Sequence, residues 1–202
     1  MKYLEYTLFP KLVLLCQYER DFKKEFEYIK NINYKNRVSN NKYLLYEPEM
    51  KNLKKFFQEA INFYITDKLK SNQKIGISQS WATVINKGEG FSAHNHPNSL
   101  INGCFYFNTD GTTPPLTLIN NRKESLYPYS FESSEHNLGS FDVRPGPGQL
   151  ILFPNILDHK VSNSTSDITR RSLAFNTFML DTLGNEELMT EINLEKIKKN
   201  NI

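Results

Sequence analysis

The sequence predicts a mostly β domain with flanking helices, an α+β arrangement in which helices buttress one sheet of a barrel or jelly roll. Two observations predict it. From residue 74 to about residue 180, β-branched and aromatic runs alternate with turn residues. Before residue 74, apolar residues recur at helical spacing. The length of 202 residues is that of one domain with its own core. We therefore expect a single domain over 1–202, with a helical support region at 1–73, a β core at 74–180 and a C-terminal helix at 181–202.

Turn residues mark the borders of the strands in the second half. They gather at Lys87–Gly90, Thr109–Thr112 and Pro145–Gly148. The runs between them predict eight strands, at 75–86, 91–96, 99–108, 115–120, 139–144, 148–154, 159–163 and 170–180. This is about the number that a barrel or jelly roll needs. Residues 121–138 interrupt the strands with little pattern and predict a long loop.

The clearest helix follows Pro48, where apolar residues from 53 to 69 keep to one face and lysines occupy the other. A second helical pattern lies within 18–32, after a short strand that we expect at 3–9. Residues 185–200 predict a terminal helix. The apolar face of the helix after Pro48 must cover an apolar surface, so we expect it to pack on a sheet.

Charge and cysteine content exclude several classes of protein. The 25 Lys and Arg against 22 Asp and Glu leave a net charge of +3, and the basic residues form no stripe with aromatics, so no nucleic-acid partner is expected. The two cysteines are too few for a disulfide framework, and no leader-like segment opens the chain, which favours a reducing cytoplasm. No apolar run approaches the roughly 18 residues that cross a bilayer, so no membrane partner is expected.

Three of the four histidines form a candidate metal site. His94 and His96 lie two residues apart directly before a strand, where extended geometry points both to one side. His159 begins another strand 63 residues after His96 (159 − 96 = 63). Imidazoles suit Fe, Zn, Cu and Ni, and three on one face of an ion leave positions open for substrate or oxygen. The alternative is that all three are unrelated turn and strand-end residues. His136, in the polar loop, is expected at the surface.

Two arginines supply a candidate anion site. Arg170 and Arg171 begin an otherwise apolar strand, and an arginine in such a strand needs an anion. A guanidinium binds a carboxylate through two parallel hydrogen bonds, which suits the far end of a dicarboxylic cosubstrate chelated to a metal. Strand alternation allows only one of the two to point inward, and the sequence leaves the choice open.

Several motifs occur in the order used by 2-oxoglutarate oxygenases. They are His94-x-His96, Phe105-Tyr-Phe-Asn108, Gly148-Gln-Leu-Ile-Leu-Phe-Pro154, His159 and Arg171-Ser-Leu-Ala-Phe-Asn176. With these motifs, an opening Leu8-Phe9-Pro10 and Ser80-Trp81, the chain resembles the 2-oxoglutarate/iron(II)-dependent oxygenase family of phages and marine bacteria, in the prolyl-hydroxylase-like superfamily. The resemblance covers nearly the whole chain. It implies a double-stranded β-helix, which is a cupin-like jelly roll, and the cytoplasm of a bacterium or of a phage-infected host cell.

The resemblance implies that His94, His96 and His159 bind iron(II) and that Arg171 pairs with the distal carboxylate of 2-oxoglutarate. The sequence departs from the wider superfamily at one ligand, because His96 stands where His-x-Asp or His-x-Glu has its carboxylate. Three neutral imidazoles hold iron(II) with one negative charge less, so zinc or nickel could compete. Asp158 is not expected to replace the carboxylate, since neighbouring strand residues face opposite ways.

Three further residues are candidates for the cosubstrate site. Tyr106 precedes Phe107-Asn108, which matches the tyrosine that hydrogen-bonds the same carboxylate in the similar prolyl hydroxylases. A plain core aromatic is the alternative for Tyr106. Asn98 and Ser99 are close enough in sequence to His96 to reach the metal or the cosubstrate.

The resemblance implies an iron(II)- and 2-oxoglutarate-dependent dioxygenase, expected to be a hydroxylase that couples decarboxylation of 2-oxoglutarate to oxidation of a substrate by molecular oxygen. Two alternatives stay open: a three-histidine, cupin-like metalloenzyme that does not use 2-oxoglutarate, and a non-catalytic jelly-roll binding protein. The sequence does not identify the substrate as a small molecule or a protein. It also leaves the oligomeric state open, a homodimer included.

Overall fold

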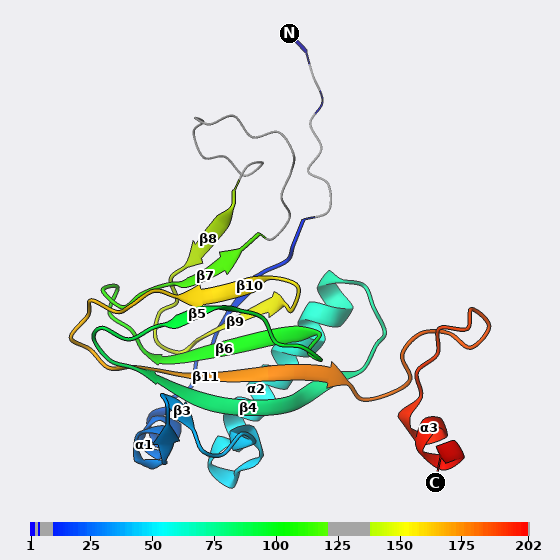
Figure 1. Cartoon of the computed structure of the whole chain (residues 1–202), viewed down its shortest axis with the longest axis horizontal. Helices are drawn as coiled ribbons and strands as arrows, with labels where there is room; N and C mark the ends of the chain where they lie inside the picture. The colour runs from blue at the N-terminus through cyan, green and yellow to red at the C-terminus, as the bar shows by residue number, and fades with distance from the viewer. Residues whose placement is uncertain (3, 5–9, 121–137, 202) are drawn as a thin grey trace.

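The computed structural model describes residues 1–2, 4, 10–120 and 138–201. Eight strands form its core (Figure 1), and each lies within two residues of a strand that the sequence predicted. They are β4 (Ile75–Ile85), β5 (Phe91–His94), β6 (Ile101–Asn108), β7 (Leu116–Ile119), β8 (Ser140–Val143), β9 (Gln149–Pro154), β10 (Asp158–Val161) and β11 (Arg170–Met179).

The strands form two antiparallel sheets. The larger sheet has the order β1-β9-β6-β11-β4-β3-β2, and the smaller sheet has the order β5-β10-β7-β8. The chain therefore passes repeatedly from one sheet to the other, and neighbours in a sheet are distant in sequence. Two facing antiparallel sheets connected in this way are a jelly roll. The predicted fold class, a mostly β jelly roll with flanking helices, is confirmed.

Strand alternation gives the larger sheet two different faces. One face lies toward the helices and contributes Phe105, Leu173 and Phe175 to the larger apolar core. The other face contributes Tyr106, Ile151 and Phe153 to a smaller core that also contains residues of the opposite sheet. In β11, residues with odd numbers thus pack under the helices, and residues with even numbers face the space between the sheets.

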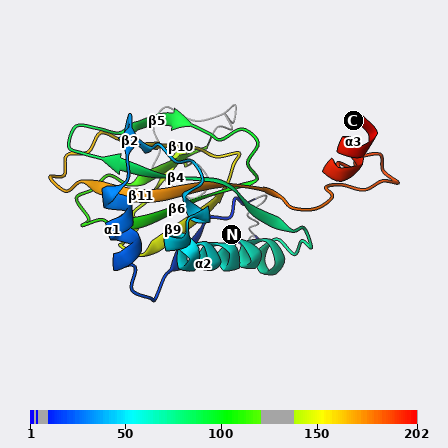
Figure 2. The same cartoon turned by 90° about the horizontal axis from the view of Figure 1, so that it is seen from below.

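Two helices cover the outer face of the larger sheet (Figure 2). The predicted helix after Pro48 is present as a 3-10 turn, η2 (Pro48–Met50), followed by α2 (Lys51–Asn62) and a π-helical turn, η3 (Phe63–Lys68). Its apolar face buries Leu53, Phe57 and Ile61 against the sheet. A short 3-10 turn, η1 (Leu44–Tyr46), precedes η2. These elements support the sheet from outside and leave the space between the sheets free for side chains of the strands.

The helix expected within 18–32 is shorter, because α1 spans only Lys23–Asn31. Tyr18 instead extends an edge strand, β1 (Leu14–Gln17), since its N–H donates to the Gly148 carbonyl at 2.9 Å. Asp21 lies before α1, and its Oδ1 accepts the N–H of Lys23, the first residue of the helix, at 2.9 Å. The sequence analysis did not predict β1.

A small hairpin was also not predicted. It consists of β2 (Tyr34–Lys35) and β3 (Val38–Ser39), and its turn residues Asn36 and Arg37 both have positive φ. Positive φ at both central residues is the geometry of a tight hairpin turn, which usually signals itself through glycine. Arg37 gives no such signal.

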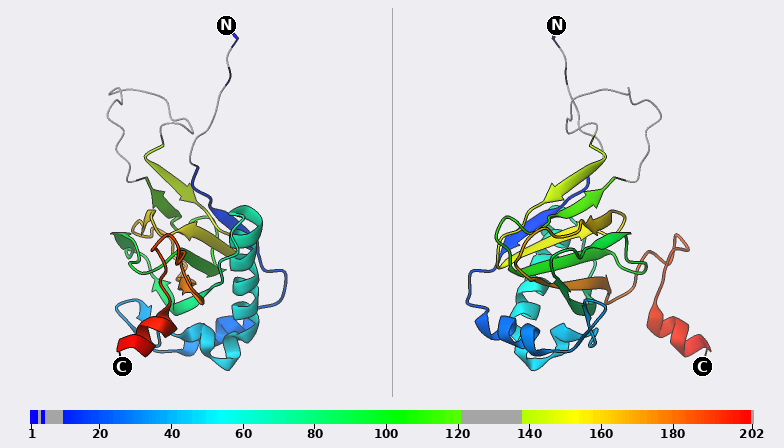
Figure 3. Two further views of the ribbon diagram at one scale, coloured as in Figure 1. Left: turned by 90° about the vertical axis from the view of Figure 1, so that its right-hand side faces the viewer. Right: turned by 60° about the vertical axis from the view of Figure 1, so that its left-hand side comes forward.

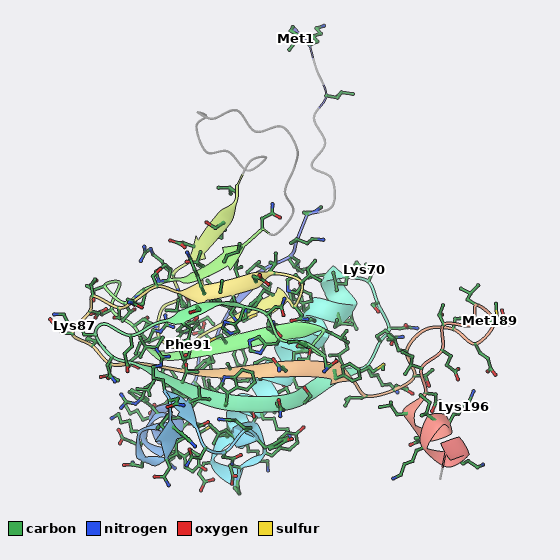
Figure 4. The ribbon with its side chains drawn as sticks, in the orientation of Figure 1. Met1, Lys70, Lys87, Phe91, Met189 and Lys196 are labelled. Atoms are coloured by element: carbon green, nitrogen blue, oxygen red, sulfur yellow. The ribbon has the colours of Figure 1, made fainter. Side chains whose placement is uncertain are left out.

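The terminal helix is half as long as expected, since α3 spans Leu194–Asn201. Residues before it form turns, with Gly184 and Met189 at positive φ and the Thr190 N–H bonded to the Asn185 carbonyl at 3.0 Å. This segment extends away from the sheets (Figure 3), and Met189 and Lys196 mark it in Figure 4.

The strand expected at 3–9 and the loop expected at 121–138 fall almost entirely outside the described residues, as does His136. Among the helices of the described ranges, none combines the length and the apolar character that a bilayer crossing requires.

Candidate metal centre

Three histidines come together between the two sheets. His94 ends β5, His159 lies opposite it in the ladder between β5 and β10, and His96 follows two residues after β5. One ligand atom from each lies within 4.8 Å of the other two. No other group of three potential ligand residues was found in the described ranges. The three histidines that the sequence singled out are therefore neighbours in space.

The spacing of the rings matches a coordination sphere. The Nε2 atoms of His96 and His159 are 3.2 Å apart. Two nitrogens that each lie about 2.0–2.1 Å from a common ion, at angles between octahedral and tetrahedral, would be separated by roughly 2.8–3.4 Å. An ion can therefore bind both atoms with little rearrangement.

Burial keeps two of the rings in the form that binds metals. Burial, followed by the neighbouring His94, lowers the pKa of His96 to about 4. Burial, followed by His94 and His96, lowers the pKa of His159 to about 3. Both rings are neutral at neutral pH and offer a lone pair. His94 is exposed, and its Nδ1 lies 2.7 Å from the Ser92 carbonyl. Because a carbonyl only accepts, Nδ1 carries the proton and Nε2 is left free to bind a metal.

No carboxylate of the described residues joins the cluster. Asp158 precedes His159 but accepts a hydrogen bond from the Asn95 side chain at 2.9 Å. The expectation that Asp158 does not replace the missing acidic ligand agrees with this position. The candidate ligand set consists of three neutral imidazoles.

A cavity of about 170 Å³ extends inward from the histidines. The smaller sheet contributes His94 and His159, the turn after β5 contributes His96, and the larger sheet contributes Trp81, Asn102, Tyr106 and Arg170. No Asp or Glu of the described residues lines it. The cavity therefore has cationic and neutral polar groups at its walls and no acidic group from this part of the chain.

The structure places Arg170 in the cavity and Arg171 on the other face of β11, which corrects the assignment of Arg171 to the cosubstrate site. Arg170 is buried, with 3% of its surface exposed, and its guanidinium lies 5.3 Å from the centre of the Tyr106 ring. Arg171 lies on the helix side near Tyr34. Burial raises the pKa of Tyr34 to about 12, and the charge of Arg171 opposes this rise. Strand alternation forces the split, because neighbouring residues of β11 face opposite ways.

Tyr106 is in the cavity as predicted, and burial raises the pKa of its phenol well above the usual value. Asn98 and Ser99 do not line the cavity. Asn98 is exposed, with φ +62°, in the turn before β6. Ser99 is buried, but its hydroxyl donates to the Ile101 carbonyl at 3.1 Å and accepts the Thr177 N–H at 3.2 Å. Their proximity to His96 in sequence did not bring them to the cavity.

The sequence analysis missed the roles of two residues beside the histidines. Trp81 stacks on His96, with ring centres 5.2 Å apart and planes 21° from parallel. Asn102 is buried and lines the cavity. Both face inward from the larger sheet, and only the pairing of the strands brings them opposite the histidines. Strand alternation places Trp81 on the inward face of β4, and this was the one sequence signal that could have indicated its role.

Unsatisfied buried atoms test whether a metal and a dicarboxylate fit this cavity. Two buried atoms at the cavity, Arg170 Nε and Asn102 Oδ1, have no hydrogen-bond partner in the described structure, and the Tyr106 hydroxyl has only the Cys104 thiol, a weak partner. Arg171 Nε and Asn176 Oδ1 are also unpaired but do not line the cavity. Buried polar groups are nearly always hydrogen-bonded, so orphaned donors and acceptors around one cavity indicate a bound polar group. A phenol and a guanidinium both donate to a carboxylate. The residues present therefore fit an anionic cosubstrate beside a metal.

Comparison with known families and structures agrees with this site. Residues 79–176 match the model of the family described as "Putative 2OG-Fe(II) oxygenase". No curated protein sequence matches the chain at the threshold applied.

Solved structures share the fold at low identity. HygX from Streptomyces hygroscopicus, with nickel, 2-oxoglutarate and hygromycin B bound, has a TM-score of 0.61 and 11% identity over 82% of each chain. A prolyl hydroxylase from Trichoplax adhaerens, in complex with a hypoxia inducible factor peptide fragment, has a TM-score of 0.60 and 13% identity over 82% of this chain and 83% of that chain. An oxidoreductase of the 2OG-Fe(II) oxygenase family from Burkholderia pseudomallei has a TM-score of 0.57 and 9% identity, over 82% and 84%. The family match over residues 79–176, which include all three histidines of the cluster, supports an oxidoreductase of the 2OG-Fe(II) oxygenase type, a dioxygenase that uses iron(II) and 2-oxoglutarate.

Proposed function

We propose that the protein is a hydroxylase in which His94, His96 and His159 hold iron(II), and Arg170 and Tyr106 bind the distal carboxylate of 2-oxoglutarate. All five of these side chains line one cavity. The proposal assigns an anionic partner to Arg170, the buried guanidinium of that cavity. It also assigns donors to the carboxylate from two different strands, β6 and β11.

Arg170 is buried without an acidic partner among the described residues, and this observation carries the proposal. Its guanidinium donates one hydrogen bond to the Pro114 carbonyl at 2.6 Å, and its Nε is unpaired. Burying a guanidinium without an anion costs on the order of several kcal/mol, because the charge loses its hydration. A carboxylate bound by this fork would offset the penalty, and charge-assisted pairs of this kind are the stronger ones.

The exposure of the lining residues supports an order of occupants along the cavity. His94 is exposed, whereas His159 and Arg170 are buried, with 8% and 3% of their surfaces exposed. The cosubstrate then occupies the inner end, and the substrate approaches from the side of His94. One structure of similar fold holds hygromycin B and another holds a peptide fragment, so we propose a small molecule or a peptide as substrate.

When bound, iron(II) with 2-oxoglutarate supplies the oxidation by molecular oxygen, coupled to decarboxylation to succinate. The protein's own residues orient the metal and the cosubstrate and enclose them in the cavity. The three imidazoles fix the metal on one side, Arg170 and Tyr106 orient the cosubstrate, and the apolar wall formed by Phe153 and Leu116 limits access of water. Two free cysteines, Cys16 and Cys104, are consistent with the reducing cytoplasm that we propose as its location.

The test compares Arg170→Met with Arg171→Met, two neighbouring arginines on opposite faces of one strand. Binding is measured anaerobically by the visible absorption that a 2-oxo acid acquires on chelating iron(II), and turnover by succinate release. Arg170→Met should weaken 2-oxoglutarate binding by about 10- to 100-fold, the worth of a hydrogen bond to a charged group. Arg171→Met should leave it within about threefold. Equal binding by both variants would exclude Arg170 as the anchor.

The carboxylate-free ligand set favours one second candidate, a three-histidine metalloenzyme that does not use 2-oxoglutarate. That function gives Arg170 no anionic cosubstrate to bind. Metal binding by the wild-type protein without any absorption change on addition of 2-oxoglutarate would support it.

A further inference from the structure

His96 differs from the other two candidate ligands in how the backbone holds it. His94 and His159 are partners in the ladder between β5 and β10. His96 lies beyond the end of β5, in the turn that leads to β6. No strand pairing fixes its backbone, so other contacts must hold its ring toward the ion.

Asn155 makes one of these contacts. The His96 N–H donates to Asn155 Oδ1 at 3.0 Å, and Asn102 Nδ2 donates to the same oxygen at 3.4 Å. A backbone N–H can only donate, so the Asn155 atom facing it must be the amide oxygen. Asn102 must then present its NH₂ group to that oxygen. The orientation of both amides is thus determined by the chain itself.

Asn155 is in turn fixed by the larger sheet. It follows β9, and its own N–H donates to the Leu100 carbonyl at 3.2 Å. Trp81, in β4 of the same sheet, stacks on the His96 ring. His94 and His159 belong to the smaller sheet. Among the three histidines, His96 is therefore the ligand that the larger sheet holds.

We propose that Asn155 and Trp81 are positioning residues for His96: Asn155 fixes its backbone by hydrogen bond, and Trp81 fixes the plane of its ring. The inference rests on the proposed function, because it needs the three histidines to bind a metal. It adds that a bound metal would link the two sheets, because the larger sheet holds His96 whereas His94 and His159 belong to the smaller sheet. Groups that orient a metal ligand in this way typically increase metal affinity by about 10- to 100-fold.

The single tryptophan of the chain makes the test direct, since Trp81 lies against a candidate ligand. Cobalt(II) bound beside it should quench its fluorescence, and zinc(II) in competition should restore it. Three variants are titrated with cobalt(II): Asn155→Leu, which lacks the acceptor; Asn155→Asp, which keeps it; and Asn108→Leu. Asn108 is the matched control, because its Oδ1 accepts the Arg171 N–H at 2.9 Å and no metal contact is assigned to it.

Asn155→Leu should weaken cobalt(II) binding by about 10- to 100-fold and change the intensity of the cobalt(II) visible absorption, because the geometry of one ligand is altered. Asn155→Asp and Asn108→Leu should bind within about threefold of the wild-type protein. Wild-type affinity and spectrum in Asn155→Leu would overturn the inference while leaving the metal site intact. An equal loss in Asn108→Leu would also overturn it, because the effect would not be specific to His96. Absence of quenching in the wild-type protein would contradict the proposed function as well.

Discussion

The Nε2 atoms of His96 and His159 lie 3.2 Å apart although 63 residues separate them in the chain. At this distance the two nitrogens can share one proton in a hydrogen bond. A second proton would place two N–H groups face to face, where they repel each other. Acid should therefore disturb the metal-free cluster. A bound cation should take the place of that proton and hold both rings.

The first prediction concerns the pH dependence of stability of the metal-free protein. The pKa values of His96 and His159 are lowered to about 4 and about 3, whereas an unfolded histidine has a pKa of about 6.5. Between these values the unfolded chain binds more protons than the folded protein, so stability falls as the pH falls from about 6.5 toward 4. Above pH 7 these two groups contribute no pH dependence. Thermal unfolding with a chelator present, from pH 7.5 to 4.5, measures it.

His159→Leu should make this acid dependence less steep, because it removes the more strongly shifted of the two groups. The comparison uses the slope of the melting temperature against pH rather than its absolute value. An unchanged slope in the variant would show that other groups cause the acid sensitivity.

The second prediction is that metal binding stabilises the protein through the three histidines. A metal at 100 times its dissociation constant stabilises by about 2.7 kcal/mol, which in a chain of this length raises the melting temperature by roughly 5–10 °C. His94→Ala should abolish the rise. Asp158→Asn should preserve it, since Asp158 bonds to Asn95 instead of joining the cluster. Differential scanning fluorimetry with zinc(II) or cobalt(II) provides the measurement. A lost rise in Asp158→Asn would make that carboxylate a ligand.

A lysine cannot substitute for Arg170, which is the third prediction. Arg170→Lys keeps the positive charge but loses the planar fork that binds a carboxylate bidentately. We expect 2-oxoglutarate affinity to fall about tenfold, less than in Arg170→Met, with metal affinity unchanged. Titration of 2-oxoglutarate into the metal-loaded protein by calorimetry gives both values. Wild-type affinity in Arg170→Lys would indicate a point charge rather than a fork.

The fourth prediction separates two tyrosines. The Tyr106 hydroxyl has no partner in the described structure other than the weakly bonding Cys104 thiol, so Tyr106→Phe should leave the melting temperature unchanged or raise it. It should weaken 2-oxoglutarate binding by about tenfold or more, the value of one hydrogen bond to a charged group. The Tyr34 hydroxyl donates to the Ile29 carbonyl at 2.7 Å, and Tyr34 does not line the cavity. Tyr34→Phe should therefore lower stability and leave cosubstrate affinity unchanged. The reverse pattern would place the anion site elsewhere.

The fifth prediction tests a close contact under the cavity. A Cβ added at Gly103 would lie 2.1 Å from Cζ of the Phe175 ring, in the sheet position directly opposite. Gly103→Ala should destabilise the protein by about 1–3 kcal/mol through overpacking. Phe175→Leu creates space, so the double variant should be less destabilised than the sum of the single variants. Urea unfolding of the four proteins measures the coupling. Additive effects would mean that the ring moves aside at no cost.

The sequence by itself determined the eight core strands and the three histidines. Runs of β-branched and aromatic residues bounded by turn residues are local signals, and the core strands carry them within or next to their own residues. The pair His94 and His96 is also a local signal. His159 could be proposed as the third ligand because histidines are so few in this chain. The strand Leu14–Gln17 was missed because four residues that pair only with β9 at a sheet edge carry no alternating pattern.

Only the tertiary structure decided which arginine faces the metal and which residues surround it. The parity of β11 depends on its register with β4 and β6, and both ladders contain an irregularity, so counting residues could not choose between Arg170 and Arg171. Asn155 and Trp81 meet His96 because three strands far apart in sequence are adjacent in space. A residue's own neighbours in the chain determine whether it is in a strand, but the pairing of strands determines what its side chain contacts.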